Sequence, residues 1–301
     1  MNSLVLGGNG YLGRELVKQL VSIGDSVISV DKFMPEIKHA GASYIICDIS
    51  IQSQIVELLE HSHVDRIFHF AGIAEIGDAN ESFCNTIHTN TLGTLFLLDA
   101  MGKKKIRNLI FASSMYVFSK KGGVYRLSKQ ISEQLISEYS TIFNLNATIL
   151  RFGSIYGPGS TESNGLHQIV KSALTGPKIR YEGNQNSVRE YIHINDAVKA
   201  CVAIANSNLK GCNFHLITGE KILKISDVLF MIKEMIGKDI EIEFGESSED
   251  GHYSITPYSF HPEKGEKYRS LDFIDFSYGL WEFIHYVSEL SMKDSAKDGS
   301  K

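Results

Sequence analysis

The sequence predicts an α/β fold in which a doubly wound parallel sheet is followed by a smaller C-terminal α+β domain. Three observations support this prediction. Short β-branched runs alternate with helix-period segments over the first half of the chain, which is typical of strands joined by helical crossovers. A glycine-rich turn separates the first such run from the first helical segment. After Phe152 the alternation gives way to the turn-rich stretch GSIYGPGSTESNG, which indicates a change of architecture.

Each expected element of the first half is a short segment whose apolar residues follow the pattern of either a strand or a helix. The strands are expected at 3–7 (SLVLG), 26–30 (SVISV), 43–47 (SYIIC), 66–70 (RIFHF), 108–113 (NLIFAS) and 146–152 (NATILRF). The helices between them are expected at 11–22, 52–61, 84–102 and 125–143. Apolar strands separated by helices predict a parallel sheet covered on both faces.

The second half has mixed elements. The turn-rich stretch itself is not expected to be regular. We then expect helices near 166–175, 195–206 and 226–236, and strands near 188–193, 213–217 and 240–244. From these elements we expect a dinucleotide-binding domain at 1–160, a substrate domain at 161–290 and a flexible polar tail at 291–301. The segment 188–215 is expected to return to the dinucleotide-binding domain.

The composition points to a protein that acts on small molecules. The 301 residues carry a net charge of −5 with acids and bases interspersed, and no basic block indicates a nucleic-acid or anionic-membrane partner. The N-terminus MNSLVLGG lacks the charged region of a signal peptide, and no apolar run approaches the ~20 residues of a membrane span. The four cysteines have no spacing typical of metal ligands, so we expect no metal and a reducing, cytoplasmic location.

A glycine-rich turn follows the first expected strand. In LVLGGNGYLGREL the residues Gly7, Gly10 and Gly13 form G-x-x-G-x-x-G. Glycines there permit a tight turn and a close approach to a pyrophosphate, whose charge the helix N-terminus attracts. Asp31 ends the second strand, where an acidic residue holds the ribose hydroxyls of NAD and repels the 2′-phosphate of NADP. We expect a dinucleotide site; glycines that merely turn the chain are the alternative, and Lys32 leaves NADP open.

Two Tyr-x-x-x-Lys pairs lie in SSMYVFSKKGGVYRLSK, and only one of them fits a helix. About one such spacing is expected by chance in a chain with 13 tyrosines, so the context decides. Tyr116 and Lys120 fall at the end of an apolar run that we expect to be extended. Tyr125 and Lys129 open a helical segment, in which positions i and i+4 share a face.

The second pair has the chemistry of a proton-transfer group. The ammonium of Lys129, one turn along from Tyr125, favours the phenolate and should lower a pKa that starts near ~10. Ser114 lies at the carboxyl end of the preceding strand, where open α/β sheets bind ligands, and its hydroxyl can hold the same substrate oxygen. The alternative is a solvated Tyr and Lys at a helix end.

With these residues in place, the sequence resembles the extended short-chain dehydrogenase/reductase family, and within it the NAD-dependent nucleotide-sugar epimerases and dehydratases. The resemblance covers nearly the whole chain and implies a Rossmann-type fold with NAD as cofactor. Besides the glycine turn, it rests on the motifs CDIS (47–50), FHFAG (68–72), NTLGT (90–94), SSMYVF (113–118), YRLSK (125–129), LRFGSIYGPG (150–159) and VREYIHINDA (188–197).

The resemblance also implies roles for single residues. The catalytic residues would be Ser114, Tyr125 and Lys129, and Lys129 would also hold the nicotinamide ribose. The cofactor would be bound, with Asp48 and Ile49 against adenine, by Gly7, Gly10, Tyr11, Leu12, Gly13, Asp31, Lys32, Asp48, Ile49, Phe70, Ala71, Gly72, Asn90 and Gly153. The substrate would be contacted by Met115, Tyr116, Ser154 and Arg189. Arg189 matches an arginine that binds a nucleotide phosphate, with a surface salt bridge as the alternative, and packing at the sheet edge is the alternative for Tyr116.

The residues after Ser114 narrow the reaction. Sugar dehydratases of this family carry carboxylates at the positions of Met115 and Tyr116, and the fucose-synthase type of epimerase-reductase carries Cys at Tyr116. These comparisons favour a 4-epimerase that acts on a nucleotide-activated sugar through a transient 4-keto intermediate, in polysaccharide biosynthesis. An NAD(P)H-dependent 4-keto-sugar reductase and a non-catalytic dinucleotide sensor are the alternatives.

Two further regions carry expectations. The run 249–269 is expected to contact substrate, with a solvated loop as the alternative, because the second arginine of the usual diphosphate clamp is absent. The helices at 84–102 and 125–143 are those through which this family dimerises, so a homodimer is expected, although their apolar positions can equally belong to the core.

Overall fold

The computed structural model describes residues 1–245, 253–261 and 265–298. The chain forms two compact units. The first comprises 1–152, 198–217 and 257–268, and the second comprises 153–197, 218–256 and 269–301. The expected return to the first domain began at 188, whereas residues 188–197 belong to the second unit, and the contribution of 257–268 to the first unit was not anticipated.

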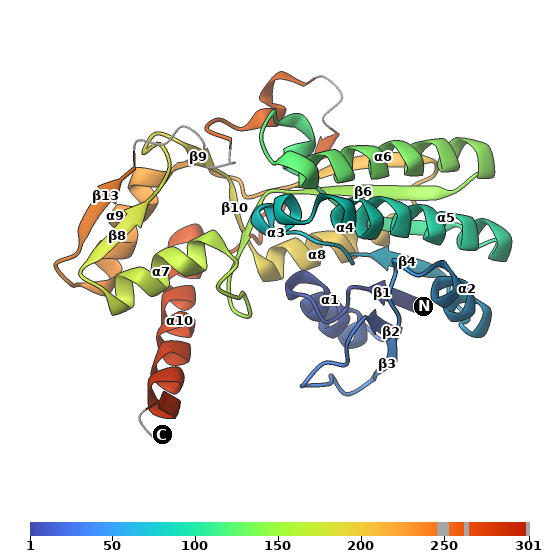
Figure 1. The fold of residues 1–301 in the computed structure, drawn as a ribbon, viewed down its shortest axis with the longest axis horizontal. Coiled ribbons are helices and arrows are strands. Elements are labelled where there is room, and N and C mark those ends of the chain that lie inside the picture. Colours follow the sequence, from blue (N-terminus) through green and yellow to red (C-terminus); the bar gives the residue numbers. More distant parts are fainter. Residues whose placement is uncertain (246–252, 262–264, 299–301) are drawn as a thin grey trace. The chain divides into compact units, whose positions relative to one another are not determined.

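The first unit is built on an eight-stranded parallel sheet with the order β14-β11-β6-β5-β4-β1-β2-β3 (Figure 1). Its strands are β1 (Asn2–Leu6), β2 (Ser26–Asp31), β3 (Ala42–Ile46), β4 (Arg66–His69), β5 (Asn108–Ser114), β6 (Asn146–Phe152), β11 (Cys212–Ile217) and β14 (Glu266–Lys267). The central strands are buried on both faces, and even polar residues such as Arg66 and His69 of β4 have almost no exposed surface. The predicted doubly wound parallel sheet is confirmed.

Helices cover this sheet and seal its core. They are α1 (Tyr11–Ser22), α2 (Gln52–His61), α3 (Ile76–Glu81), α4 (Phe83–Thr86), α5 (Gly93–Lys104) and α6 (Gly123–Phe143), with α8 (Ile194–Ala205) entering from the second unit's part of the chain. Figure 1 shows α5 and α6 lying side by side along the sheet. One face packs Leu4, Ile67 and Phe111 of the strands against Leu97 of α5 and Ile136 of α6, all with almost no exposed surface.

Two segments of the first unit differ from the expected elements. The helix expected at 84–102 is three successive pieces, because a π-helical turn, η1 (Ile87–Leu92), separates α4 from α5. The segment expected to be extended after Ser114 is instead a 3-10 turn, η2 (Met115–Phe118), whose start is capped by the Ser114 hydroxyl. A second 3-10 turn, η3 (Pro257–Phe260), lies in the last segment of the first unit.

The second unit combines short strand pairs with three helices. The parallel pairs are β7 (Ser154–Tyr156) with β10 (Tyr191–His193) and β8 (Lys178–Tyr181) with β13 (Glu241–Phe244), and the antiparallel pair is β9 (Val188–Arg189) with β12 (Leu223–Lys224). The helices are α7 (Gly165–Thr175), α9 (Ile225–Ile236) and α10 (Phe276–Asp298). Their apolar faces enclose a core that contains Tyr156, Val170, Leu229 and Phe283.

Three expectations for the second half were wrong. The turn-rich stretch contains the regular strand β7, which has a parallel partner in β10. The strand expected at 188–193 is broken into β9 and β10. The tail expected at 291–301 begins inside α10, which runs to Asp298; residues 299–301 lie outside the described part of the chain. Helix α10 forms because Phe276, Leu280, Phe283 and Val287 recur with helical spacing and are all buried.

Candidate active site

The glycine turn brings three parts of the chain into close main-chain contact. Gly7 has φ +80°, and a Cβ added there would lie 2.5 Å from the amide nitrogen of Ala71. A Cβ on Gly13 would lie 2.0 Å from the carbonyl oxygen of Gly7. Helix α1 then begins after Gly10 without a side-chain cap or an acidic residue in its first turn, where Tyr11 and Leu12 lie. The turn therefore suits a pyrophosphate, which needs a main chain that it can approach closely. It also needs a helix N-terminus whose positive charge no side chain offsets.

Asp31 stands where a ribose-binding acid is expected, at the carboxyl end of β2. One carboxylate oxygen accepts a hydrogen bond from the amide of Asn9 at 3.1 Å, and the other accepts one from the amide of Lys32 at 2.8 Å. The carboxylate is thereby fixed beside the glycine turn. The Lys32 ammonium lies 5.3 Å from the centre of the Phe33 ring, so it is turned along the exposed loop.

The two residues expected against adenine have different environments. The Asp48 carboxylate accepts hydrogen bonds from the amide and the hydroxyl of Ser50, at 2.9 and 2.7 Å. Burial raises the pKa of Asp48, but these hydrogen bonds outweigh it and hold the pKa below its usual value. The side chain of Ile49 lies in the apolar core against Gly93, so a ligand would meet its main chain only.

The loop after β4 lies between the glycine turn and α6. The amide of Phe70 donates to Leu6 at 2.9 Å, which continues the β1–β4 pairing. Gly72 has φ +153°, and a Cβ there would lie 2.8 Å from Oδ1 of Asn90. The Asn90 amide donates to Ile73 O at 2.9 Å and to Ser128 Oγ at 3.0 Å, while Oδ1 accepts from the Ile73 amide at 2.8 Å. Asn90 was expected to bind the cofactor, but its buried amide is fully used in bracing this loop to α6.

Ser114, Tyr125 and Lys129 come together at the carboxyl end of β5. Ser114 is the last residue of β5, and its hydroxyl lies near enough to the phenol of Tyr125, in the first turn of α6, to favour the phenolate. Lys129 lies one turn further along the same helix. Its ammonium donates to Ala112 O at 2.8 Å and lies 4.8 Å from the centre of the Phe111 ring. The strand and the helix thus bring a hydroxyl, a phenol and a buried cation together at the carboxyl end of β5.

The ionisation of Tyr125 differs from the expected one. Burial raises the pKa of Tyr125, and the carboxylate of Glu75 adds to the rise, while the hydrogen bond with Ser114 opposes it. The expected lowering by Lys129 is outweighed, because that ammonium is directed at a main-chain carbonyl and an aromatic ring. Burial lowers the pKa of Lys129 to about 8, and the charge of Glu133 counteracts this fall. Neither Glu75 nor Glu133 has a local sequence signal that reveals such an influence.

The start of α6 requires two glycines. Gly122 has φ +93° and Gly123 has φ +50°, and a Cβ on Gly122 would lie 2.7 Å from the ring of Tyr116. The amide of Val124, exposed by this sharp entry, donates to Oδ1 of Asn80 at 3.1 Å. Tyr116 consequently packs edge-on against Tyr125, with ring centres 6.3 Å apart.

The side chain of Met115 does not contribute to the site formed by Ser114, Tyr125 and Lys129. Its side chain is 1% exposed and is packed with Leu216 and Tyr258 in an apolar cluster of the first unit. The expectation that it contacts substrate was therefore wrong for the side chain, because the 3-10 turn after Ser114 points it into the core.

The remaining expected substrate residues belong to the second unit. The guanidinium of Arg189 donates to the carbonyls of Val188 and Tyr253, at 2.9 and 2.6 Å, and lies over the Tyr253 ring at 4.8 Å. The Tyr253 phenol is hydrogen-bonded to the side chain of Ser154, and burial raises its pKa. A Cβ on Gly153 would meet Thr218 at 3.0 Å. Arg189 and Ser154 are therefore joined through Tyr253, a residue of the unusual run 249–269, of which 249–252 and 262–264 lie outside the described residues.

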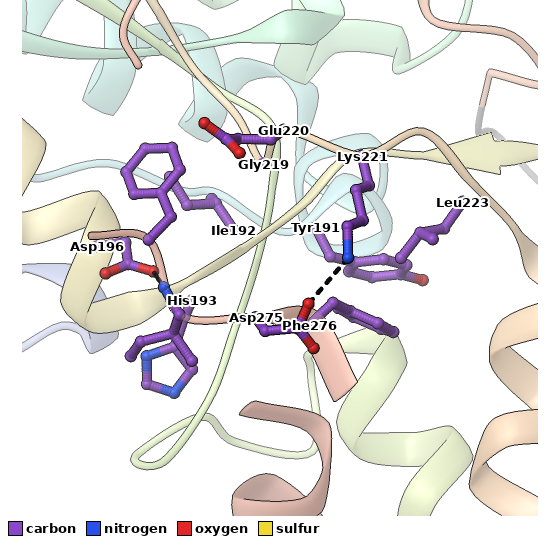
Figure 2. Close-up of a pocket in the computed structure, with 12 residues that line it drawn as sticks. Tyr191, Ile192, His193, Asp196, Gly219, Glu220, Lys221, Leu223, Asp275 and Phe276 are labelled. Carbon is purple, nitrogen blue, oxygen red and sulfur yellow. Dashed lines mark hydrogen bonds and ion pairs between the residues drawn. The ribbon is translucent and has the colours of Figure 1, made fainter. Parts of the chain in front are cut away.

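A cavity of about 120 Å³ lies beside these strands in the second unit. Figure 2 shows the Lys221 ammonium directed at the Asp275 carboxylate, 2.8 Å away, above the rings of Tyr191 and Phe276, which are stacked with centres 5.4 Å apart. Asp196, in the first turn of α8, accepts a hydrogen bond from the amide of Ile274 at 2.8 Å. Lys221, Asp275 and Asp196, three charged groups that line the cavity, are thus engaged with the protein itself.

The described residues lack two further kinds of feature. No helix there combines the length and the apolar character needed to cross a membrane. No group of three or more His, Cys, Asp or Glu side chains is arranged there to hold a metal ion.

Comparison with known proteins identifies the family. The model of the NAD dependent epimerase/dehydratase family matches residues 3–216. A UDP-glucose 4-epimerase of Corynebacterium glutamicum is 27% identical over 273 residues, which cover 81% of this chain and 83% of that protein. A UDP-N-acetyl-alpha-D-glucosaminuronate decarboxylase of Bacillus cytotoxicus is 28% identical over 237 residues, covering 69% and 72%. The structure of UDP-glucuronic acid 4-epimerase from Bacillus cereus, in complex with UDP-glucuronic acid and NAD, has the same fold, with a TM-score of 0.81, 23% identity and coverage of 96% and 100%. The chain belongs to the NAD-dependent epimerase/dehydratase family of extended short-chain dehydrogenases/reductases.

Proposed function

We propose that this protein is an NAD-dependent 4-epimerase of a nucleotide-activated sugar. The observation that carries the proposal is that Ser114 and Tyr125 lie close together, with Lys129 buried one turn along the same helix. A dinucleotide-binding protein without turnover needs the glycine turn and Asp31, but it does not need a phenol held by a serine beside a buried ammonium. The relatives named above act on UDP-linked sugars, so these are the first substrates to test.

In the proposed reaction, Ser114 and Tyr125 hold the oxygen at C4 of the sugar. Bound NAD would supply the hydride acceptor and donor at C4. Tyr125 removes the hydroxyl proton as the ketone forms and gives it back when the opposite face of C4 is reduced, so that no redox equivalent is consumed. Tyr125 takes this proton as the phenolate, and burial, which raises the pKa of Tyr125, makes that ionised form the minor one at neutral pH.

The cofactor would lie across the carboxyl ends of β1, β2 and β4. The glycine turn and the start of α1 would hold the pyrophosphate, and Asp31 would hold the adenosine ribose. The fixed carboxylate of Asp31 favours NAD over NADP, since a 2′-phosphate would face a like charge. Lys129 would reach the nicotinamide ribose, and the main chain at 48–49 and 70–72 would line the rest of the site.

The second unit holds the residue proposed to bind a nucleotide phosphate. Arg189 carries a buried positive charge that suits a nucleotide phosphate, and its contact with Tyr253 links it to Ser154. Dehydration is disfavoured, because Met115 is packed in the core and Tyr116 carries a phenol where dehydratases of the family carry a carboxylate.

The protein is proposed to act as a cytoplasmic homodimer, and polysaccharide precursors are the proposed product class. Its four cysteines are free thiols, which fits a reducing compartment. The surface of α4 and α6 offers Phe83 and Ile142, which are 55% and 67% exposed, to a second subunit.

The test is turnover of UDP-, dTDP- and GDP-sugars and their 4-keto forms with NAD or NAD(P)H. Sugar product and dinucleotide are followed together. Conversion without net change in dinucleotide supports the epimerase. Consumption of one reduced dinucleotide per product would instead identify the protein as a 4-keto-sugar reductase, a reaction in which Ser114, Tyr125 and Lys129 can take part. Tight dinucleotide binding without turnover of any sugar would favour the sensor.

A further inference from the structure

Glu133 is a buried carboxylate with three hydrogen-bond donors. It lies on α6, one turn beyond Lys129, and is 7% exposed. Oε1 accepts from the Ser113 hydroxyl at 2.5 Å and from Nε of Arg151 at 3.0 Å, and Oε2 accepts from Nη2 of Arg151 at 2.7 Å. Burying a carboxylate is costly unless its oxygens are bonded in this way. The arrangement is therefore a rigid junction.

This junction joins the two elements that carry the proposed catalytic residues. Ser113 directly precedes Ser114 on β5, and Arg151 lies on β6, which pairs with β5 in the register Ser113 with Arg151. Tyr125, Lys129 and Glu133 recur every four residues and share one face of α6. One carboxylate thus fixes the distance between the strand that ends in Ser114 and the helix that carries Tyr125.

Arg151 is itself held firmly. Its guanidinium lies between two aromatic rings, 4.6 Å from the centre of Phe118 and 4.3 Å from that of Phe214. Phe118 belongs to the 3-10 turn that follows Ser114. The junction therefore fixes both sides of Ser114, through Ser113 before it and through Phe118 after it.

The charge of Glu133 also acts on Lys129. The titratable and charged groups around that ammonium are Glu133 and Tyr125 on its own helix, His69 on β4 and Arg151 on β6. Burial, with Lys129 nearby, lowers the pKa of His69 to about 3, so this imidazole is neutral. Arg151 is matched by the bidentate pair with Glu133. Glu133 opposes the effect of burial, which lowers the pKa of Lys129 to about 8.

We propose that Glu133 is a positioning residue of the active site: it holds the Ser114 strand and the Tyr125 helix in register and places a negative charge one helical turn from Lys129. This inference rests on the proposed function only in the role that it gives to Ser114, Tyr125 and Lys129.

The test separates the charge of Glu133 from its geometry. Glu133→Gln removes the charge and keeps the size, and we expect the alkaline limb of the kcat/KM profile to move down by about 1–3 pH units. Glu133→Asp keeps the charge but shortens the reach to Ser113 and Arg151, so kcat should fall while the limb stays in place. Ser113→Ala removes one hydrogen bond and no charge, and should lower kcat without moving the limb.

The double variant Glu133→Leu/Arg151→Met tests a merely structural role, since a buried ion pair can often be replaced by apolar side chains without loss of stability. If this folded variant or Glu133→Gln keeps the wild-type kcat and pH profile, the proposal is overturned. If the wild type turns over no sugar, the proposed function fails separately. The Lys129 titration, followed by NMR of labelled lysine in wild type and Glu133→Gln, then decides the inference: a downward shift supports it and an unchanged titration overturns it.

Discussion

The hydroxyl of Ser114 lies close to the phenol of Tyr125, although one residue ends a strand and the other lies in the first turn of a helix that follows a 3-10 turn. The contact depends on two glycines that permit a left-handed entry into α6. It places two groups that can bind one substrate oxygen side by side before any substrate arrives, which is the form of preorganisation on which proton-transfer catalysis relies.

Replacing Tyr125 with Phe removes the oxygen that is proposed to carry the proton. We expect kcat to fall by about 10²- to 10⁴-fold and NAD affinity to stay unchanged, because the glycine turn and Asp31 are untouched. Product analysis by chromatography and calorimetric titration with NAD measure the two quantities. Tyr278→Phe, at an exposed position of α10, is the matched control. Full activity in Tyr125→Phe would remove this residue from the mechanism.

Replacing Glu75 with Gln should make Tyr125 more acidic. The Glu75 carboxylate disfavours the phenolate and so raises the pKa of Tyr125. Without that charge the pKa falls, a larger share of phenolate exists at a given pH, and the rising limb of kcat/KM moves to lower pH. The measurement is a pH profile of initial rates. Asp78→Asn, in the same helix at an exposed position, should leave the limb in place. A limb that moves to higher pH would contradict the assignment.

Replacing Gly13 with Ala should disrupt the dinucleotide site. The new Cβ would lie 2.0 Å from the Gly7 carbonyl oxygen, so the turn must open. We expect loss of NAD binding and a free energy of unfolding lower by about 1–3 kcal/mol. Urea unfolding and NAD titration test both effects. Gly102→Ala is the control, since no heavy atom lies within 4 Å of its added Cβ and alanine favours a helix by about 0.5–1 kcal/mol.

Replacing Asp31 with Asn should change cofactor preference. The side-chain amide of Asn keeps an acceptor oxygen for only one of the main-chain amides of Asn9 and Lys32, and it removes the charge that repels a 2′-phosphate. The ratio of NADP to NAD affinity should rise by about tenfold or more, since like charges brought together cost several kcal/mol. Fluorescence titration with both dinucleotides measures the ratio. An unchanged ratio would show that another group reads the ribose.

Local signals account for what the sequence predicts well. Most strands from β1 to β6 are largely apolar runs separated by helices, with β2 and β3 joined by a loop, and the glycine turn lies at a strand–helix junction. Both features are visible within a few residues of chain. The parallel sheet and the family were therefore predicted correctly. The roles given to single residues remain predictions.

Contacts between distant segments account for the rest. Arg189 bonds to Tyr253, and Glu133 bonds to Arg151, across stretches of chain that show no mutual pattern. The burial of Met115 follows from a 3-10 turn whose apolar run is equally compatible with a strand. The side-chain amide of Asn90 donates hydrogen bonds to Ile73 and Ser128, which are distant from it in sequence and come close only in the folded chain.

The first unit consists of three separate segments of the chain, and this affects how the protein folds during its synthesis. Strand β11, which pairs with β6 along its whole length, comes after the first long segment of the second unit, and β14 comes after the next. While the ribosome is still synthesising residues 153–211, β6 is the outer strand of the growing sheet, with one row of main-chain groups unpaired. Such an open edge invites pairing with other chains. The nascent protein is thus most exposed to aggregation during synthesis of its second unit, and a chaperone that shields β6 would act in that interval.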